Sequence, residues 1–110
     1  MPEKVTHDEF KRLDIRVVAV VRAERIPGRT KILKALIDIG NNEVREVVVG
    51  GAEHYQPEYF VGKKMIAVVN LEERVIAGVR SQAMLLAADD KGRPVWLMPA
   101  EDVPAGAKVL

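Results

Sequence analysis

Apolar and polar residues alternate along the first part of the chain. From residue 15 onward, every second position is apolar, and charged residues fill many of the positions between them. A period of two is typical of a strand that buries one face. We therefore predict a long first strand whose core-facing residues are Ile15, Val17, Ala19, Val21 and Ala23.

Further apolar runs complete a set of five strands. Glycine, asparagine and proline separate the runs, and these residues suit turns. Gly40-Asn41-Asn42 should close a hairpin, because asparagine and glycine tolerate positive φ. The remaining strands are predicted at residues 33–39, 44–49, 64–69 and 84–88, with a short edge piece at 95–98.

Two short helices are expected between these strands. Thr6 and Glu9 have the spacing of a capping box, which predicts a helix over His7–Arg12. Pro57 can begin a single helical turn that ends at Phe60, between the third and fourth strands. This order of elements is that of the OB fold, a five-stranded β-barrel, so we predict an all-β protein.

Composition limits the other possibilities. The 110 residues, of which 48% are hydrophobic, suit a single domain over 1–110. Cysteine is absent, so disulfides and thiolate chemistry are excluded. No apolar run is long enough to span a bilayer, and the first residues are polar, so a cytoplasmic protein is expected. The net charge of +1 means that any nucleic-acid contact must use localised cations.

Several separated stretches resemble one known family. They look like the tRNA-binding domain appended to methionyl-tRNA synthetases, which also occurs alone as a small tRNA-binding protein and in related secretion chaperones. The resemblance implies an OB barrel, a homodimer, no catalysis and no cofactor, with tRNA as the ligand. The stretches are Phe10-Lys11-Arg12-Leu13-Asp14-Ile15-Arg16-Val17, Val61-Gly62-Lys63-Lys64, Val69-Asn70-Leu71 and Ser81-Gln82-Ala83-Met84-Leu85-Leu86-Ala87-Ala88.

The chain departs from this family at two places. The loop before the second strand reads Ile26-Pro27-Gly28-Arg29-Thr30-Lys31, so it has lost an acid and gained an arginine. Ala83 stands where many members have glycine. Alanine replaces glycine without a large loss of stability only at negative φ, so we expect ordinary strand backbone at this position.

Cations near the first turn are candidates for phosphate contact. Arg29, Lys31 and Lys34 lie in or just after the loop between the first two strands, which borders the ligand groove in OB folds. The alternative is that they belong to a solvated strand face, and for Lys34 the two readings are balanced.

The segment after the fourth strand supplies further candidates. Asn70 either contacts RNA or bonds its own backbone in a turn. Residues 71–80 should form a loop at the open end of the barrel, with Arg74 and Arg80 available to phosphate. Pairing with Glu72 or Glu73 is the alternative for Arg74, and we expect Arg80 to be the less neutralised of the two arginines.

Ser81, Gln82 and Met84 carry the strongest family match. Alternation places Ser81 and Ala83 on one face and Gln82 and Met84 on the other, so one of these faces must be core. From its residue type Met84 is expected to fill the core. The resemblance instead makes it part of an exposed apolar spot for a nucleotide.

Several functions compete at this stage. The aromatic residues do not form a stripe on the strands, which argues against a single-stranded DNA coater and favours recognition of folded RNA by shape. No spacing typical of a catalytic or metal site is present. We expect tRNA binding beside methionyl-tRNA synthetase; a peptide-binding secretion chaperone and a tethering module are the alternatives. The tail over 98–110 should be extended, and its Val103, Val109 and Leu110 could be buried in a homodimer.

Overall fold

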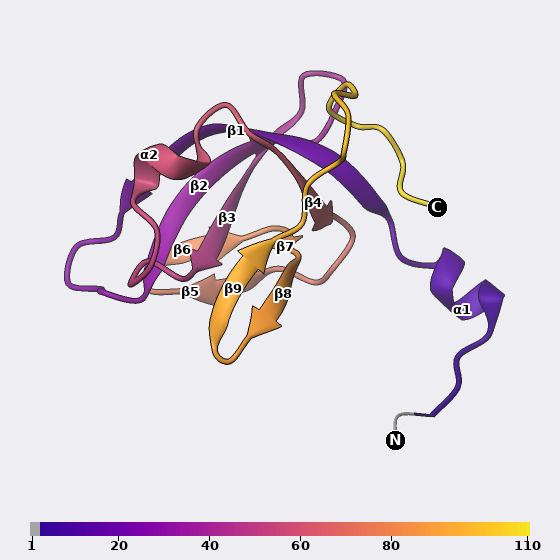
Figure 1. Ribbon diagram of the computed structural model, residues 1–110, viewed down its shortest axis with the longest axis horizontal. Coiled ribbons are helices and arrows are strands. Elements are labelled where there is room, and N and C mark those ends of the chain that lie inside the picture. Colours follow the sequence, from indigo (N-terminus) through magenta and orange to yellow (C-terminus); the bar gives the residue numbers. More distant parts are fainter. Residues whose placement is uncertain (1–2) are drawn as a thin grey trace.

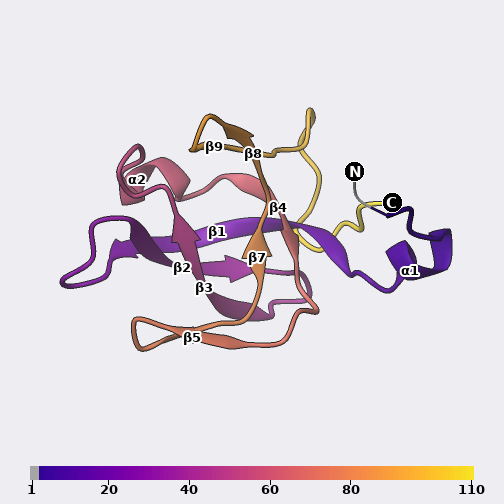
Figure 2. The ribbon, with the colours of Figure 1, turned by 90° about the horizontal axis from the view of Figure 1, so that it is seen from below.

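Five antiparallel strands curl into a nearly closed barrel in the computed structural model, which describes residues 3–110 (Figures 1 and 2). The strand order is β3-β2-β1-β4-β7. This arrangement confirms the predicted all-β, OB-type architecture. The barrel strands are β1 (Ile15–Arg25), β2 (Ile32–Asp38), β3 (Val44–Gly50), β4 (Lys64–Val68) and β7 (Met84–Leu85).

Both predicted helices are present. In α1 (His7–Lys11), the Glu9 amide donates to the Thr6 hydroxyl at 3.1 Å and the Thr6 amide donates to the Glu9 carboxylate at 3.0 Å. These two bonds are the predicted capping box. The second helix, α2 (Pro57–Phe60), begins with proline and lies between β3 and β4, as expected.

Strand β1 differs from its predicted pattern. Val18 and Val20 belong to the core, whereas Val21 is exposed. The pairing of β1 with β2 shifts between Val20 and Arg22, which marks a β-bulge. A bulge adds one residue to the strand, so the faces exchange at that point and Ala23 returns to the core. Before the bulge, Ile15 and Val17 are buried as predicted, but they lie outside the main core cluster, to which Val18 and Val20 belong. After the bulge, the predicted face is the one that packs against the core.

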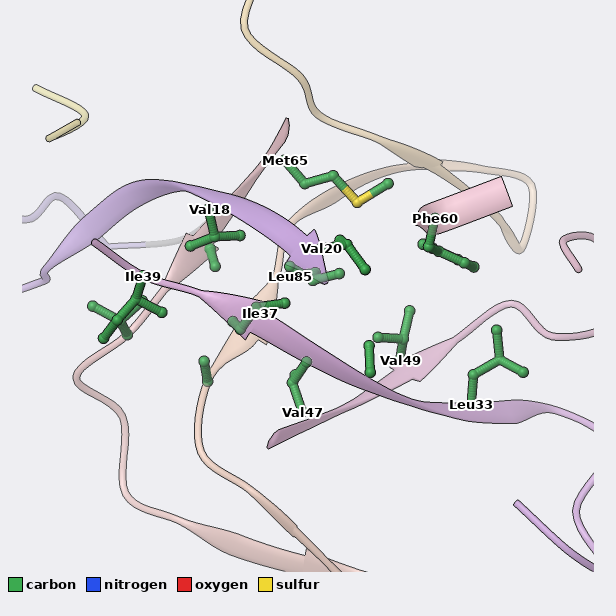
Figure 3. Close-up of a cluster of buried hydrophobic side chains, with 14 of the residues drawn as sticks. Val18, Val20, Leu33, Ile37, Ile39, Val47, Val49, Phe60, Met65 and Leu85 are labelled. Carbon is green, nitrogen blue, oxygen red and sulfur yellow. The ribbon is translucent and has the colours of Figure 1, made fainter. Parts of the chain in front are cut away.

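The core fills the barrel with aliphatic side chains and a few larger ones. Figure 3 shows Val18, Ile37 and Met65 among the residues that converge inside the sheet. Phe60 is fully buried, and its ring lies 5.5 Å from that of Trp96. Through Phe60, helix α2 packs against the barrel core. This packing holds the single helical turn in position.

Two hairpins replace features that the sequence pattern described differently. The predicted loop over 71–80 contains the strands β5 (Arg74–Ile76) and β6 (Val79–Ser81). Its turn is Ala77-Gly78, both at positive φ, and alanine is a weak hairpin signal compared with asparagine. The predicted strand over 84–88 is interrupted at Leu86. Strand β7 ends at Leu85, and β8 (Ala87–Asp90) forms a separate hairpin with β9 (Arg93–Trp96).

The C-terminal tail over residues 98–110 contains no helix and runs beside the first half of β1. The Gly106 amide donates to the Val17 carbonyl at 2.7 Å, and the Val109 amide donates to the Ile15 carbonyl at 2.8 Å. Gly106 also touches the β2–β3 turn, because a Cβ added to it would lie 2.9 Å from the Gly40 Cα. The tail therefore covers an edge of β1 that β2 leaves unpaired.

An ion pair fixes the start of β1. The Arg16 guanidinium donates to both oxygens of Asp14, at 2.8 and 3.0 Å, and to the Ile39 carbonyl at 3.0 Å. The hydrogen bonds from Arg16 hold the pKa of Asp14 below its ordinary value. The pair thus joins the start of β1 to the end of β2.

The Asp14–Arg16 pair should make the free energy of unfolding depend on pH in the acidic range. A carboxylate whose pKa is lowered by folding contributes stability that is fully present above its unfolded pKa, about 4 for aspartate, and is lost as the pH falls through the folded value. We expect Asp14→Asn to lower the free energy of unfolding at pH 7 and to have much less effect at pH 2. Urea denaturation at the two pH values measures this, and an equal loss at both would contradict it.

Candidate RNA-binding surface

The β1–β2 loop presents cations to solvent. Pro27 and Gly28 form the predicted turn, in which the Arg29 amide donates to the Ile26 carbonyl at 3.0 Å. Arg29 and Lys31 are exposed, and neither forms an ion pair with any residue among 3–110. Their charges are therefore available to an anionic ligand.

Lys34 is in a different environment from its neighbours. Its ammonium lies 3.4 Å from the Glu46 carboxylate and 3.7 Å from that of Glu24, on the outer face of β1, β2 and β3. The side chain is about two-thirds buried. Because two acids surround one cation, Lys34 adds no net positive charge for a phosphate.

The β5–β6 hairpin projects beside the barrel toward the same end as the β1–β2 loop, at the left of Figures 1 and 2. Arg74 pairs with Ser81 and Val75 with Arg80, so the two arginines lie on opposite faces of the hairpin. Arg74 is exposed, and no ion pair is formed by it within residues 3–110. It is a third available cation near this end.

Arg80 is neutralised, contrary to the sequence-based expectation. Its Nη2 lies 2.7 and 2.8 Å from the two carboxylate oxygens of Glu73, and its Nε lies 3.1 Å from one of them. Because β5 and β6 are strands, Glu73 is a diagonal cross-strand neighbour of Arg80 on the same face. The hydrogen bond from Arg80 lowers the pKa of Glu73, so this carboxylate stays ionised.

Ser81 and Gln82 close the barrel. The Ser81 hydroxyl accepts from the Val48 amide at 3.1 Å, and the Gln82 carboxamide oxygen accepts from the Glu46 amide at 3.0 Å. The backbone amide of Gln82 also donates to the Glu46 backbone carbonyl at 2.9 Å. These bonds join the segment before β7 to β3. The main role of the two side chains is therefore to close the barrel.

The position of Met84 answers the question of which face is core. Ala83 and Leu85 are buried, whereas Met84 is 48% exposed. The expectation that Met84 fills the core was therefore wrong, because the core takes the odd-numbered positions here. Ala83 does not have positive φ, as expected, but it lies in a bend and not in the predicted strand.

Asn70 links two distant parts of the chain. Its side-chain oxygen accepts from the Asp14 amide at 2.8 Å, and its side-chain nitrogen donates to the Arg12 carbonyl at 2.7 Å. The carboxamide thus joins the end of β4 to the connection between α1 and β1. Neither alternative from the sequence included this contact, since it depends on the tertiary fold.

The family of the chain follows from its sequence and its fold together. Residues 15–108 match the family described as "Putative tRNA binding domain". The chain belongs to this tRNA-binding domain family. The matched region begins at β1 and ends in the tail, so it includes the whole barrel and both hairpins.

Relatives of this tRNA-binding domain include parts of synthetases. The chain is 48% identical over 105 residues to the methionine–tRNA ligase of Methanothrix thermoacetophila and 41% identical over 105 residues to that of Thermotoga maritima. In both comparisons 96% of this chain is covered. It spans only 15% and 16% of those ligases, respectively.

Solved structures of similar size share the fold. A MetRS-related protein from Pyrococcus horikoshii has a TM-score of 0.92 and 39% identity, with 99% of this chain and 100% of that chain covered. The chaperone CsaA from Bacillus anthracis has a TM-score of 0.88 and 28% identity, with 98% and 100% covered. Both branches considered from the sequence are thus found among its structural neighbours.

An apolar cleft lies at the other end of the tRNA-binding domain. It has a volume of about 720 Å³ and is lined by residues of α1, of the segments on either side of α1 and of the tail. Helix α1 and the C-terminus lie at the right of Figures 1 and 2. Helix α1 buries no residue, and Leu110 is 99% exposed. The apolar tail was noted from the sequence, but the part played by α1 was missed. The exposed apolar residues that line the cleft are Val5, Phe10, Leu13 and Leu110.

The described residues show neither a metal centre nor a membrane span. Among residues 3–110, no three side chains of the metal-binding types are grouped to hold an ion. No helix in this range is long and apolar enough to cross a bilayer. Both histidines, His7 and His54, are exposed.

Proposed function

We propose that this domain binds tRNA without catalysis, through the end of the barrel that carries Arg29, Lys31 and Arg74. The observation that supports this most strongly is a set of exposed cations on two neighbouring projections of a tRNA-binding family domain, none of which forms an ion pair within residues 3–110. Guanidinium and ammonium groups on such projections can contact phosphate oxygens without reading bases.

The aromatic residues support recognition by shape. The rings of Tyr55 and Tyr59 are tilted by 47° with their centroids 4.7 Å apart, and both rings lie against Phe60. They pack on one another, together with Trp96, so they do not form a platform for successive bases. A folded RNA recognised through its backbone fits this surface better than a single strand.

Removing single cations from the β1–β2 loop should weaken tRNA binding. We expect Arg29→Gln and Lys31→Gln each to weaken binding of unfractionated tRNA about fivefold at 0.15 M salt, because each removes one phosphate contact. The slope of log affinity against log salt should also become shallower by about 0.7–0.9 for each variant. Fluorescence anisotropy with labelled tRNA measures both quantities.

Lys91→Gln is the control for these variants. Lys91 is equally exposed, but it lies in the β8–β9 turn, on the side of the barrel away from the β5–β6 hairpin in Figure 2. Its loss removes the same charge and should leave affinity nearly unchanged. Equal effects of all three variants would show that only the overall charge matters and would count against a localised site.

A methionyl-tRNA synthetase is the proposed partner. The similarity to segments of methionine–tRNA ligases supports this, and the MetRS-related protein that this chain covers completely supports a role as a separate tRNA-binding subunit. In this role the domain raises the concentration of tRNA near the synthetase and supplies no catalytic group itself.

The proposal includes a homodimer formed through the apolar cleft. An isolated five-residue helix is unstable in water, so α1 needs a surface against which to pack. A second copy offers the same apolar residues, and twofold pairing is the commonest form of oligomer. Because the cleft and the β1–β2 loop lie at opposite ends of the barrel, this dimer would leave both tRNA sites accessible.

A peptide-binding chaperone is the second candidate. The likeness to the CsaA chaperones of Bacillus anthracis and Picrophilus torridus favours it, and the apolar cleft supplies a surface that unfolded peptide could occupy. The two candidates differ in salt dependence, since burial of apolar side chains does not release counterions. Binding that resists salt and requires the cleft would support the chaperone.

A further inference from the structure

Of the two arginines of the β5–β6 hairpin, Arg80 is the one that is already paired with a carboxylate. Three hydrogen bonds of 2.7 to 3.1 Å join its guanidinium to Glu73. The neighbouring acid, Glu72, is exposed and forms no ion pair with residues 3–110. Of the two adjacent acids, only Glu73 therefore competes directly for an arginine on the proposed RNA-facing hairpin.

Glu73 is held in position by the seam of the barrel. The Gln82 side-chain nitrogen donates to Glu73 at 3.2 Å, while the Gln82 oxygen accepts from the Glu46 amide at 3.0 Å. This chain of bonds connects the carboxylate to β3. Glu73 is thus oriented by a rigid element, whereas Arg80 reaches it with a flexible side chain.

A phosphate offers the same acceptors as this carboxylate. Both groups present two oxygens to the fork of a guanidinium. The Arg80 side chain is 62% exposed and that of Glu73 is 46% exposed. Exposed ion pairs of this kind are weak enough to exchange partners. A backbone phosphate that reaches the hairpin can therefore replace Glu73 at Arg80, and the displaced carboxylate then remains nearby as an unfavourable charge.

We propose that Glu73 is a specificity-determining residue that competes with RNA phosphate for Arg80, so that the hairpin engages only an RNA whose shape delivers a phosphate to this point. This inference rests on the proposed tRNA-binding function. A polyanion that reaches only the cations of the β1–β2 loop leaves the Glu73–Arg80 pair intact and gains no contact from Arg80, so the contact at Arg80 is conditional on shape.

Glu73→Gln tests the competition, with Glu72→Gln as the matched control. Glutamine keeps an acceptor for Arg80 and Gln82, so the hairpin should stay in place, while the competing charge is removed. We expect Glu73→Gln to tighten binding of unfractionated tRNA about fivefold at 0.15 M salt. The slope of log affinity against log salt should also become steeper, by up to about 0.7–0.9, because binding no longer displaces a carboxylate that takes up a cation from solution. Glu72→Gln should have a clearly smaller effect.

A double-mutant cycle with Arg80→Gln separates this competition from a general change in charge. Arg80→Gln should weaken tRNA binding more in the Glu73→Gln background than in the original chain, because only there is Arg80 unoccupied. Equal effects of Glu73→Gln and Glu72→Gln, or equal effects of Arg80→Gln in both backgrounds, would overturn the inference. Failure of the unaltered chain to bind tRNA at any salt concentration would instead overturn the proposed function itself.

Discussion

Replacing Gly106 by alanine is expected to lower the free energy of unfolding by about 2–4 kcal/mol, because two costs add. Gly106 has a φ of +96°, which disfavours any residue with a Cβ. The new Cβ would also lie 2.9 Å from the Gly40 Cα, and this neighbour is backbone that cannot rotate away. The tail must then move from β1. Urea denaturation monitored by circular dichroism measures the loss.

Gly92→Ala separates the two costs. Gly92 has a φ of +91°, close to that of Gly106, but a Cβ there meets nothing within 4 Å. It should therefore lose only about 1 kcal/mol, the cost of the backbone conformation alone. If both variants lost the same amount, the contact between the tail and the β2–β3 turn would contribute nothing to the fold.

Phe10→Asp should disrupt the proposed homodimer. Phe10 is 45% exposed in the single chain and lines the apolar cleft. Twofold symmetry buries two copies of it, each worth about 1.5–3 kcal/mol, so the dimer dissociation constant should rise about 10²–10⁴-fold. Sedimentation equilibrium across a concentration series measures this constant.

Val61→Asp is the control for the dimer prediction. Val61 is 48% exposed, similar to Phe10, but it follows α2 and does not line the cleft. Its substitution should leave the dissociation constant unchanged. A chain that is monomeric at every concentration, or one that Phe10→Asp leaves dimeric, would place the dimer interface elsewhere or exclude it.

Local patterns predicted most of the fold. The capping box of α1, the proline of α2 and the asparagines of the β2–β3 turn each act through nearest neighbours, so the sequence alone locates them. The bulge in β1 could not be located in this way. Its only signal is Val21, an apolar residue on a strand that is apolar on both faces, and the pairing with β2 decides where the extra residue lies.

The candidate site was less predictable, because it depends on partners far along the chain. Lys34 is neutralised by acids on two other strands, and Asn70 bonds to the connection before β1. Arg80 is paired because β5 and β6 form a hairpin whose turn is unusual. Arg29 and Lys31 remain candidates, since an exposed loop gives them no competing partner within residues 3–110.

The family motif Ser81-Gln82-Ala83-Met84 illustrates the difference between a conspicuous sequence and a contact surface. Ser81 and Gln82 close the barrel against β3, and Ala83 fills the core. Only Met84 projects to solvent. The motif therefore identifies the fold, while the proposed RNA contacts lie mainly on the projections at the end of the barrel.

The most direct test of the proposed function compares three ligands with the unaltered chain. Unfractionated tRNA, duplex DNA of similar length and an unfolded peptide are titrated by fluorescence anisotropy over a series of salt concentrations. We expect tRNA to bind most tightly, with log affinity falling by about 0.7–0.9 per log of salt for each phosphate contacted. Peptide binding that is insensitive to salt, with no affinity for tRNA, would contradict the proposal and support the chaperone.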